Sequence, residues 1–143
     1  AAYVDSVGGG PSIPTEEMLA SGDDLAAGGE LFRINCAMCH NVAGAGGALT
    51  EGKFAPPLTG VDSVHIWEAM VIGPQNMPVF NDQNISPEDK ANIIAYLKYI
   101  ETSPSVGGYA LGSLGPVSAG LFSWIFGLGA SVGTRVGLTA RPN

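Results

Sequence analysis

Hydrophobic residues recur at intervals of three and four in two stretches of the chain, which is the spacing of one face of an α-helix. The first stretch follows Ser21-Gly22-Asp23-Asp24, which resembles a capping box with acids favoured by the helix dipole, and it predicts a helix to about Asn35. Its shared face consists of Leu25, Gly28, Leu31 and Phe32. Glycine inside a helix costs stability, so Gly28 indicates close backbone contact with another helix.

The second stretch begins at Ser86-Pro87-Glu88-Asp89, which has serine at the N-cap, proline at the first helical position and an acid at the third. It predicts a helix to about Thr102. The apolar stripe of this helix consists of Ile93, Ile94, Leu97 and Ile100.

Weaker signals predict one helical turn over residues 15–19 and a short helix from a cap at Asp62 through Ile72, stopped by Gly73-Pro74. Residues 44–60 form a glycine-rich loop without periodicity, stiffened at its end by prolines. No stretch predicts a strand, so we expect the part of the chain before residue 109 to be all-α.

Residues 109–134 contain 26 residues without a charge, which is long enough to span a bilayer even if the helix begins after Pro116. Arg135 and Arg141 follow, which favours a cytoplasmic C-terminus. Small residues recur every fourth position at Gly129, Gly133 and Gly137, a pattern suited to packing against another membrane helix. A flexible Gly/Ser-rich tail is the competing interpretation, and Arg135 would have to reach the interface or a polar neighbour.

Charge is distributed unevenly along the 143 residues. Residues 1–108 hold all 13 acidic side chains and four basic ones, a formal charge of −9, whereas residues 109–143 carry +2. An acidic domain repels nucleic acid and could steer a basic redox partner, although the charge could equally serve solubility alone. No signal peptide opens the chain, so we expect a mature or truncated product.

The chain has two cysteines, and both lie in Cys36-Ala37-Met38-Cys39-His40. Cys-x-x-Cys-His is typical of c-type haem attachment, in which two thiols on one helical turn form thioethers with the haem vinyl groups and the histidine ligates the iron. A zinc site would need four ligands, and no second cysteine pair or His-x-x-x-His is present. A redox dithiol would need a strand–helix setting, which the preceding residues do not predict.

The second axial ligand has four candidates in the sequence, which are Met18, His65, Met70 and Met77. Met77 is favoured because it lies in a loop between two predicted helices, and a loop can place a thioether over the haem face opposite His40. A Met/His pair fills both axial positions, which suits outer-sphere electron transfer and disfavours substrate binding at iron. The carbonyl of Pro56 could accept a hydrogen bond from the other nitrogen of His40, although this proline could simply stiffen its loop.

The N-terminal residues echo a later part of the chain. Ala2-Tyr3-Val4 before Gly8 resembles Ala95-Tyr96-Leu97 before Gly107-Gly108. We therefore expect residues 1–14 to be the stub of a preceding similar domain with its linker, residues 15–108 a haem c domain, and residues 109–143 a membrane anchor with a short cytoplasmic end. A disordered terminus is the alternative for the stub.

In combination, these motifs resemble the class I cytochromes c over about residues 22–102. The matching residues are Gly28, Phe32, Cys36, Cys39, His40, Pro56-Pro57-Leu58-Thr59-Gly60, Met77-Pro78 and Ile94-Ala95-Tyr96-Leu97-Lys98. The resemblance implies the class I fold around a covalent haem c and implies that Leu58 also contacts the haem. We therefore expect an all-α class I cytochrome c fold, followed by one C-terminal transmembrane helix.

Gly8–Pro11, Asn76–Phe80, Ile93–Lys98 and Gly107–Pro116 resemble more closely the dihaem cytochrome c subunit of the actinobacterial cytochrome bcc complex. That resemblance implies a subunit with two haem c domains and one C-terminal membrane helix, of which this chain is similar to the second domain and anchor. It further implies that the subunit accepts electrons from a Rieske iron–sulfur centre and passes them to an aa3-type oxidase. The implied partners include cytochrome b and a preceding haem c domain. The haem domain would lie outside the cell membrane.

Three classes of function remain open from the sequence. The first is an electron-transfer subunit of a menaquinol-oxidising complex, not catalytic in isolation. The second is a stand-alone membrane-anchored carrier, which Gly129 and Gly133 disfavour because they invite a partner helix. The third is an enzyme or gas sensor with an open iron site, which would bind carbon monoxide in the ferrous form.

Overall fold

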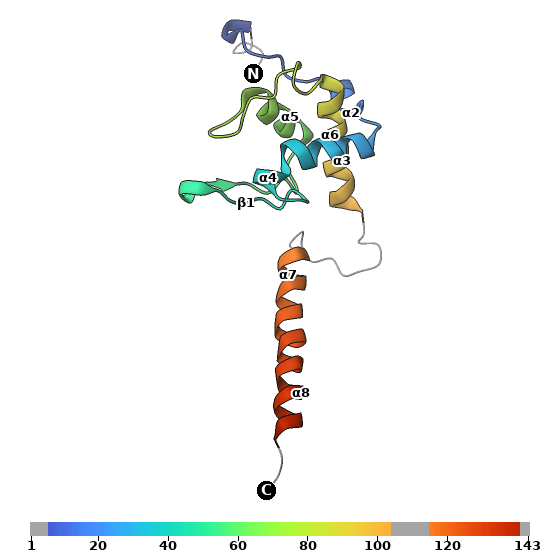
Figure 1. Ribbon diagram of the computed structural model, residues 1–143. Helices are drawn as coiled ribbons and strands as arrows, with labels where there is room; N and C mark the ends of the chain where they lie inside the picture. Colours follow the sequence, from blue (N-terminus) through green and yellow to red (C-terminus); the bar gives the residue numbers. More distant parts are fainter. Residues whose placement is uncertain (1–5, 104–114, 141–143) are drawn as a thin grey trace. The chain divides into compact units, whose positions relative to one another are not determined.

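The computed structural model describes residues 6–103 and 115–140 (Figure 1). The chain forms two compact units, Ala1–Pro104 and Ser105–Asn143, which are taken separately below. Most of the N-terminal echo, the Gly107-Gly108 exit, the start of the uncharged stretch at Tyr109, and Arg141 lie outside the described residues.

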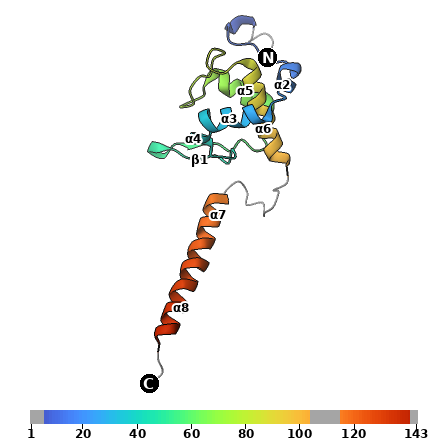
Figure 2. The same cartoon turned by 45° about the vertical axis from the view of Figure 1, so that its right-hand side comes forward.

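The first unit is built mainly from helices, with a short hairpin at one side (Figure 1). Its elements are α2 (Glu16–Ala20), α3 (Leu25–Asn35), α4 (Ala37–His40), β1 (Gly47–Ala48), η1 (Thr50–Gly52), β2 (Phe54–Ala55), α5 (Ser63–Ile72) and α6 (Pro87–Thr102). The four helices predicted from sequence are present with nearly the predicted bounds. Figures 1 and 2 show α3 lying across α6, the contact on which the domain is assembled.

The start of α6 follows the predicted chemistry, because the Ser86 hydroxyl accepts a hydrogen bond from the Asp89 N–H at 3.1 Å and Pro87 opens the helix. The predicted cap of α3 was wrong. Asp24 caps that helix and accepts from the N–H groups of Ala26 and Ala27, whereas Ser21 ends α2 and donates to the Met18 carbonyl. Two caps in succession occupy residues 21–24, so the capping-box pattern spanned a boundary between helices.

The crossing of α3 and α6 depends on glycine. A Cβ on Gly28 would collide with the Asn92 carbonyl, and one on Gly22 would collide with the Ala91 carbonyl. The predicted close backbone contact at Gly28 is therefore confirmed. Asn92 is buried, and its side-chain oxygen accepts from the N–H groups of Asp23 and Asp24 at 3.1 and 3.2 Å, so α6 also secures the chain just before α3.

The core lies between α3, α5 and α6. Its buried residues are Phe32, Ile66, Trp67, Met70, Ile85, Ala91, Ile93, Ile94 and Leu97, with Ile100 packed against them. The predicted stripe of α6 is confirmed. Phe32 is fully buried, which contributes about 1.5–3 kcal/mol. Leu25 was expected on the same face and is instead 38% exposed, because it lies in the first turn of α3 at the end of the contact with α6.

The all-α prediction was wrong in one detail. Residues 47–48 and 54–55 form an antiparallel ladder in which Gly47 pairs with Ala55 and Ala48 with Phe54. Each strand has two residues, too short for an alternating pattern to be read in the sequence. The hairpin instead depends on local turns, with Glu51 and Gly52 at φ of +59° and +72°.

The second unit is one long helix that comprises α7 (Gly115–Phe122), η2 (Ser123–Leu128) and α8 (Gly129–Thr139). In η2 the turns widen to π geometry without breaking the helix, and the rings of Phe122 and Phe126 stack at 4.5 Å. The apolar part, Val117–Thr139, has 23 residues and is about 34 Å long at 1.5 Å per residue. That is long enough to cross a hydrocarbon core of about 30 Å.

Candidate haem-binding site

Cys36, Cys39 and His40 lie on one tight turn where α3 ends and α4 begins. Cys36 is both the C-cap of α3 and the N-cap of α4, and its carbonyl accepts from the N–H groups of Cys39 at 3.1 Å and His40 at 2.9 Å. Both cysteines are free thiols and half-buried. The turn therefore presents two sulfurs and an imidazole together, which is the arrangement that attachment of a c-type haem needs.

Burial, and secondarily the neighbouring Cys39 thiol, raises the pKa of Cys36 to about 11. A thiol with so high a pKa is almost entirely protonated at neutral pH and is a poor nucleophile toward disulfides. This argues against a redox dithiol. Within residues 6–103 and 115–140, no group of three or more His, Cys, Asp and Glu side chains is arranged to hold a metal ion.

The ring of His40 is oriented by Pro56, sixteen residues away in the chain. Its Nδ1 lies 3.0 Å from the Pro56 carbonyl oxygen. A carbonyl can only accept, so the contact requires the tautomer with hydrogen on Nδ1, and the lone pair then belongs to Nε2. Fixing one imidazole nitrogen on a carbonyl is how proteins orient a histidine that ligates a metal through the other. This donor set fits an iron with one imidazole ligand.

The loop that carries Pro56 is held by backbone contacts. The Leu58 N–H donates to the Gly44 carbonyl at 2.7 Å, and the Gly46 N–H donates to the His40 carbonyl at 2.9 Å. Gly44 and Gly46 have φ of +69° and +73°, and a Cβ on Gly46 would collide with the backbone of residues 55–57. Leu58 is half-buried and packs against the core. The glycine-rich stretch therefore folds around the cysteine–histidine turn.

Met77 lies in the loop between α5 and α6, as expected. Its N–H donates to the Pro74 carbonyl at 3.0 Å, and its half-buried side chain packs against the core. Gly73 ends α5 with φ +60°, and a Cβ there would crowd the Met77 carbonyl and Val79. The turn at Gly73 therefore determines where the Met77 loop leaves α5.

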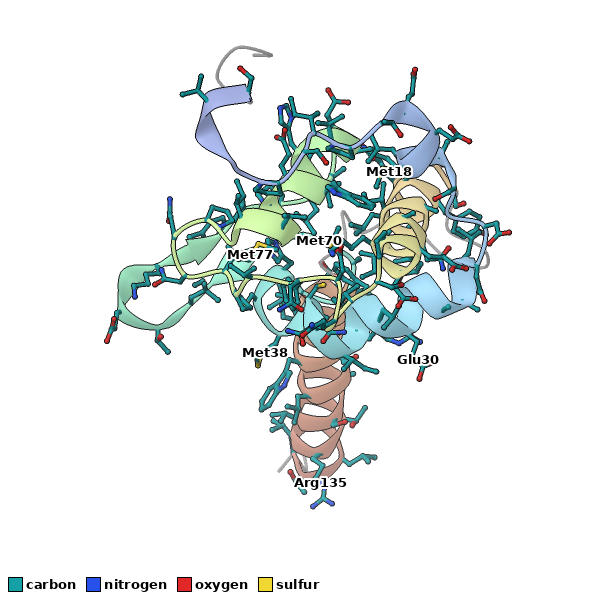
Figure 3. All side chains as sticks on the ribbon, turned by 90° about the horizontal axis from the view of Figure 1, so that it is seen from above. Met18, Glu30, Met38, Met70, Met77 and Arg135 are labelled. Atoms are coloured by element: carbon teal, nitrogen blue, oxygen red, sulfur yellow. The ribbon has the colours of Figure 1, made fainter. Side chains whose placement is uncertain are left out.

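The other candidate ligands are less available. Met70 is 2% exposed within the core, His65 is exposed on α5, and Met18 lies on α2 at 38% exposure. Met77 packs against the core that includes Met70, and the Phe80 N–H, three residues after Met77, donates a hydrogen bond to the Met70 carbonyl on α5 at 2.8 Å; Figure 3 labels both methionines. The assignment of Met77 as a ligand stays a prediction.

The contacts of two lysines were not predicted from the sequence. Lys90 is fully buried, with its ammonium 2.6 Å from an Asp82 carboxylate oxygen and 5.9 Å from the Trp67 ring centroid. Lys98 donates to the Val61 carbonyl at 2.6 Å. A signal for Lys90 was present, because it precedes Ile93, Ile94 and Leu97 at helical spacing and so belongs to the buried stripe.

Comparison with known proteins agrees with this geometry. Residues 23–97 match the family described as "Cytochrome C oxidase, cbb3-type, subunit III". Proteins named "Cytochrome bc1 complex cytochrome c subunit" are also similar. The one from Corynebacterium efficiens is 44% identical, and the alignment covers 99% of this chain and 53% of the relative. The one from Mycobacterium bovis is 45% identical, with 98% of this chain and 52% of the relative covered. The one from Mycobacterium leprae is 42% identical, with 98% of this chain and 50% of the relative covered.

The chain spans about half the length of these curated relatives, and the alignments include both of its compact units. The match to residues 23–97 covers α3 to most of α6, and so includes the cysteine–histidine turn, the Pro56 loop and the Met77 loop. The predicted resemblance to the cytochrome c subunit of a bc-type complex is thereby confirmed. The chain belongs to the cytochrome c family that is described as "Cytochrome C oxidase, cbb3-type, subunit III".

Proposed function

We propose that this chain is the haem c domain and membrane anchor of an electron-transfer subunit in a menaquinol-oxidising cytochrome bcc complex. The observation that carries the proposal is the hydrogen bond from His40 Nδ1 to the Pro56 carbonyl, because His40 lies on the same turn as the two free thiols of Cys36 and Cys39. The names of the relatives, which are cytochrome c subunits of bc1 complexes, support the placement in a complex rather than a stand-alone carrier.

Each site residue has a defined role in this proposal. Cys36 and Cys39 would tether haem c through thioethers, and His40 Nε2 and Met77 Sδ would be the two ligands that this chain gives the iron. Pro56 fixes the plane of the His40 ring, and Leu58 would contact the haem from the Pro56 loop. The bound haem supplies a one-electron ferric–ferrous couple.

With a histidine and a methionine of this chain as its ligands, the iron would be closed to substrates, and the haem would serve outer-sphere electron transfer. The chain is then non-catalytic alone and acts as a relay. It passes electrons from a Rieske iron–sulfur subunit towards an aa3-type oxidase, and its partners include cytochrome b and a preceding haem c domain. The formal charge of −9 on residues 1–108 favours a donor or acceptor surface that is basic.

The helix Val117–Thr139 anchors the chain in the cell membrane in this proposal. Arg135 lies near its C-terminal end, which supports a cytoplasmic C-terminus and a haem domain on the outer side. A protease added to intact spheroplasts should then release the haem domain, whereas inside-out vesicles should protect it. Equal protection in both preparations would contradict this orientation.

The haem attachment is tested by denaturation. Chain purified from its native membrane should keep its haem through acidified organic solvent and should weigh more than the polypeptide by one haem. The double variant Cys36→Ala/Cys39→Ala should lose haem under the same treatment. Retention of haem by the double variant, or its loss from the unmodified chain, would remove covalent attachment from the proposal.

A further inference from the structure

The positive side chains of the acidic unit are few, and three of the four contact the loops that flank the candidate haem site. Lys53 donates to the Asn76 side chain at 3.1 Å, next to Met77. Lys98 donates to the Val61 carbonyl, beyond the Pro56 loop. Lys90 pairs with Asp82, five residues after Met77. Of the three, only Lys90 is fully buried, and it therefore depends most on its partner.

Lys90 lies in the first turn of α6, and its ammonium meets one carboxylate oxygen of Asp82 at 2.6 Å. The face of Trp67 on α5 lies 5.9 Å from the same nitrogen. A buried ammonium without a partner costs several kcal/mol, so the Asp82 carboxylate is held where the nitrogen is. Asp82 itself is 69% exposed and could otherwise move with its loop.

The segment from Met77 to Ser86 has no regular structure to fix it. Within it, Asn81 forms a local turn by accepting hydrogen bonds from the N–H groups of Gln83, Asn84 and Ile85. The contacts that attach the segment to the rest of the domain include the hydrogen bond from the Phe80 N–H to the Met70 carbonyl, the buried side chain of Ile85, and the Asp82–Lys90 pair. Among the ion pairs of the described residues, this is the one that joins the segment to a helix. Asp82 lies between Phe80 and Ile85, where the loop turns back toward α6.

We propose that Lys90 is a positioning residue for the second axial ligand: by holding Asp82 against α5 and α6, it keeps Met77 seated over the iron. The inference rests on the proposed ligation by Met77 and deepens it. A thioether is a weak ligand that stays bound because its loop presents it, so loosening the loop exposes the iron to competing ligands. The structure thus assigns to one buried lysine a role that its position in a helix stripe would not suggest.

The test is a titration of the haem-loaded full chain in the ferric state with imidazole, which competes with Met77 for the iron. The readout is the loss of the near-red absorption band of methionine–iron ligation. Asp82→Asn removes the charge that holds the loop and should strengthen imidazole binding on the order of tenfold, which corresponds to about 1.4 kcal/mol. Asp82→Glu keeps the pair and should stay within about twofold of the unchanged protein.

Two further variants separate positioning from folding. Lys90→Met with Asp82→Asn removes both charges and fills the buried site with an apolar side chain of similar length, so it avoids an unpaired buried ammonium and should still bind imidazole on the order of tenfold more tightly. Glu88→Gln removes one negative charge from the same first turn of α6 without touching the loop, and it should leave imidazole affinity unchanged.

Failure of the ligation and failure of the inference give different results. If the unchanged protein has no methionine–iron band, or Met77→Ala binds imidazole no more tightly, ligation by Met77 is wrong. If Met77→Ala behaves as proposed but Asp82→Asn and the double variant both stay within about twofold of the unchanged protein, the role of Lys90 is wrong. An equal increase in Glu88→Gln would likewise overturn it, because any charge change on this face would then suffice.

Discussion

His40 and Pro56, sixteen residues apart, are joined by a hydrogen bond of 3.0 Å from the ring Nδ1 to the backbone carbonyl. The bond fixes both the tautomer and the orientation of the ring through groups of the protein alone. It makes the glycine-rich stretch part of the site, because Gly44 and Gly46 adopt the positive φ values that bring Pro56 back to α4.

Replacing Met77 with alanine should lower the reduction potential of the haem-loaded chain by on the order of 100–200 mV, within the range of about 0.8 V that axial ligands span. The ferrous protein should also begin to bind carbon monoxide. Potentiometric titration measures the first effect and optical spectroscopy the second. Met70→Leu and His65→Ala are the controls, and a potential that falls in either of them but not in Met77→Ala would move the ligand to that residue.

Gly28→Ala should destabilise the haem domain by about 2–3 kcal/mol, because the added methyl collides with the Asn92 carbonyl at the crossing of α3 and α6. Chemical denaturation followed by far-ultraviolet circular dichroism measures the free energy of unfolding. Gly10→Ala is the matched control, because nothing lies within 4 Å of its Cβ position and its φ is not positive. A loss in the control as large as in Gly28→Ala would contradict the account of the crossing.

Glu101 should stabilise the domain near neutral pH and lose this contribution in acid. The Lys98 ammonium and the Gly60 N–H hold the pKa of its carboxyl below the ordinary value. A lowered folded-state pKa stabilises above the unfolded-state pKa, and this contribution is lost as the pH falls through the folded-state pKa. The stability difference between the unchanged protein and Glu101→Gln should therefore be constant near neutral pH and vanish in acid. A difference that persists in strong acid would assign the effect to packing instead.

Gly133→Ile should weaken association of the anchor with its complex. Gly129, Gly133 and Gly137 recur every fourth residue, and nothing within the described residues lies near their Cβ positions, so this strip is free for a neighbouring helix. The measurement is the ratio of b-type to c-type haem that copurifies in mild detergent, which should fall. Val132→Ile, on a larger neighbouring residue, should leave the ratio unchanged, and an equal loss in both variants would remove the glycine strip from the interface.

The helices of the fold could be predicted because their signals are local. Ser86 and Pro87 mark the start of α6 in the sequence. Gly28 indicates a close helix crossing, because glycine inside a helix costs stability and therefore suggests that a larger side chain would not fit there. The cysteine–histidine turn is equally local, because its three functional side chains lie within five residues.

Features that depend on distant partners could not be predicted. Asn92 secures the start of α3 from another helix, the buried Lys90 pairs with Asp82 in a preceding loop, and the ladder of β1 and β2 is too short for periodicity. The same limit explains the error at Ser21, whose local pattern suits two successive caps and fixes neither. A local sequence pattern allows several such contacts, and the tertiary structure determines which of them forms.

The central claim is that this chain is the haem c subunit of a quinol-oxidising complex, and the most direct test is a reduced-minus-oxidised optical spectrum of the chain purified by a tag from its native membrane in mild detergent. The account predicts a c-type band together with b-type bands, with the c-type contribution of this domain lost in Cys36→Ala/Cys39→Ala. A c-type band without b-type haem would instead show a solitary anchored carrier, and a spectrum without haem c would contradict the account.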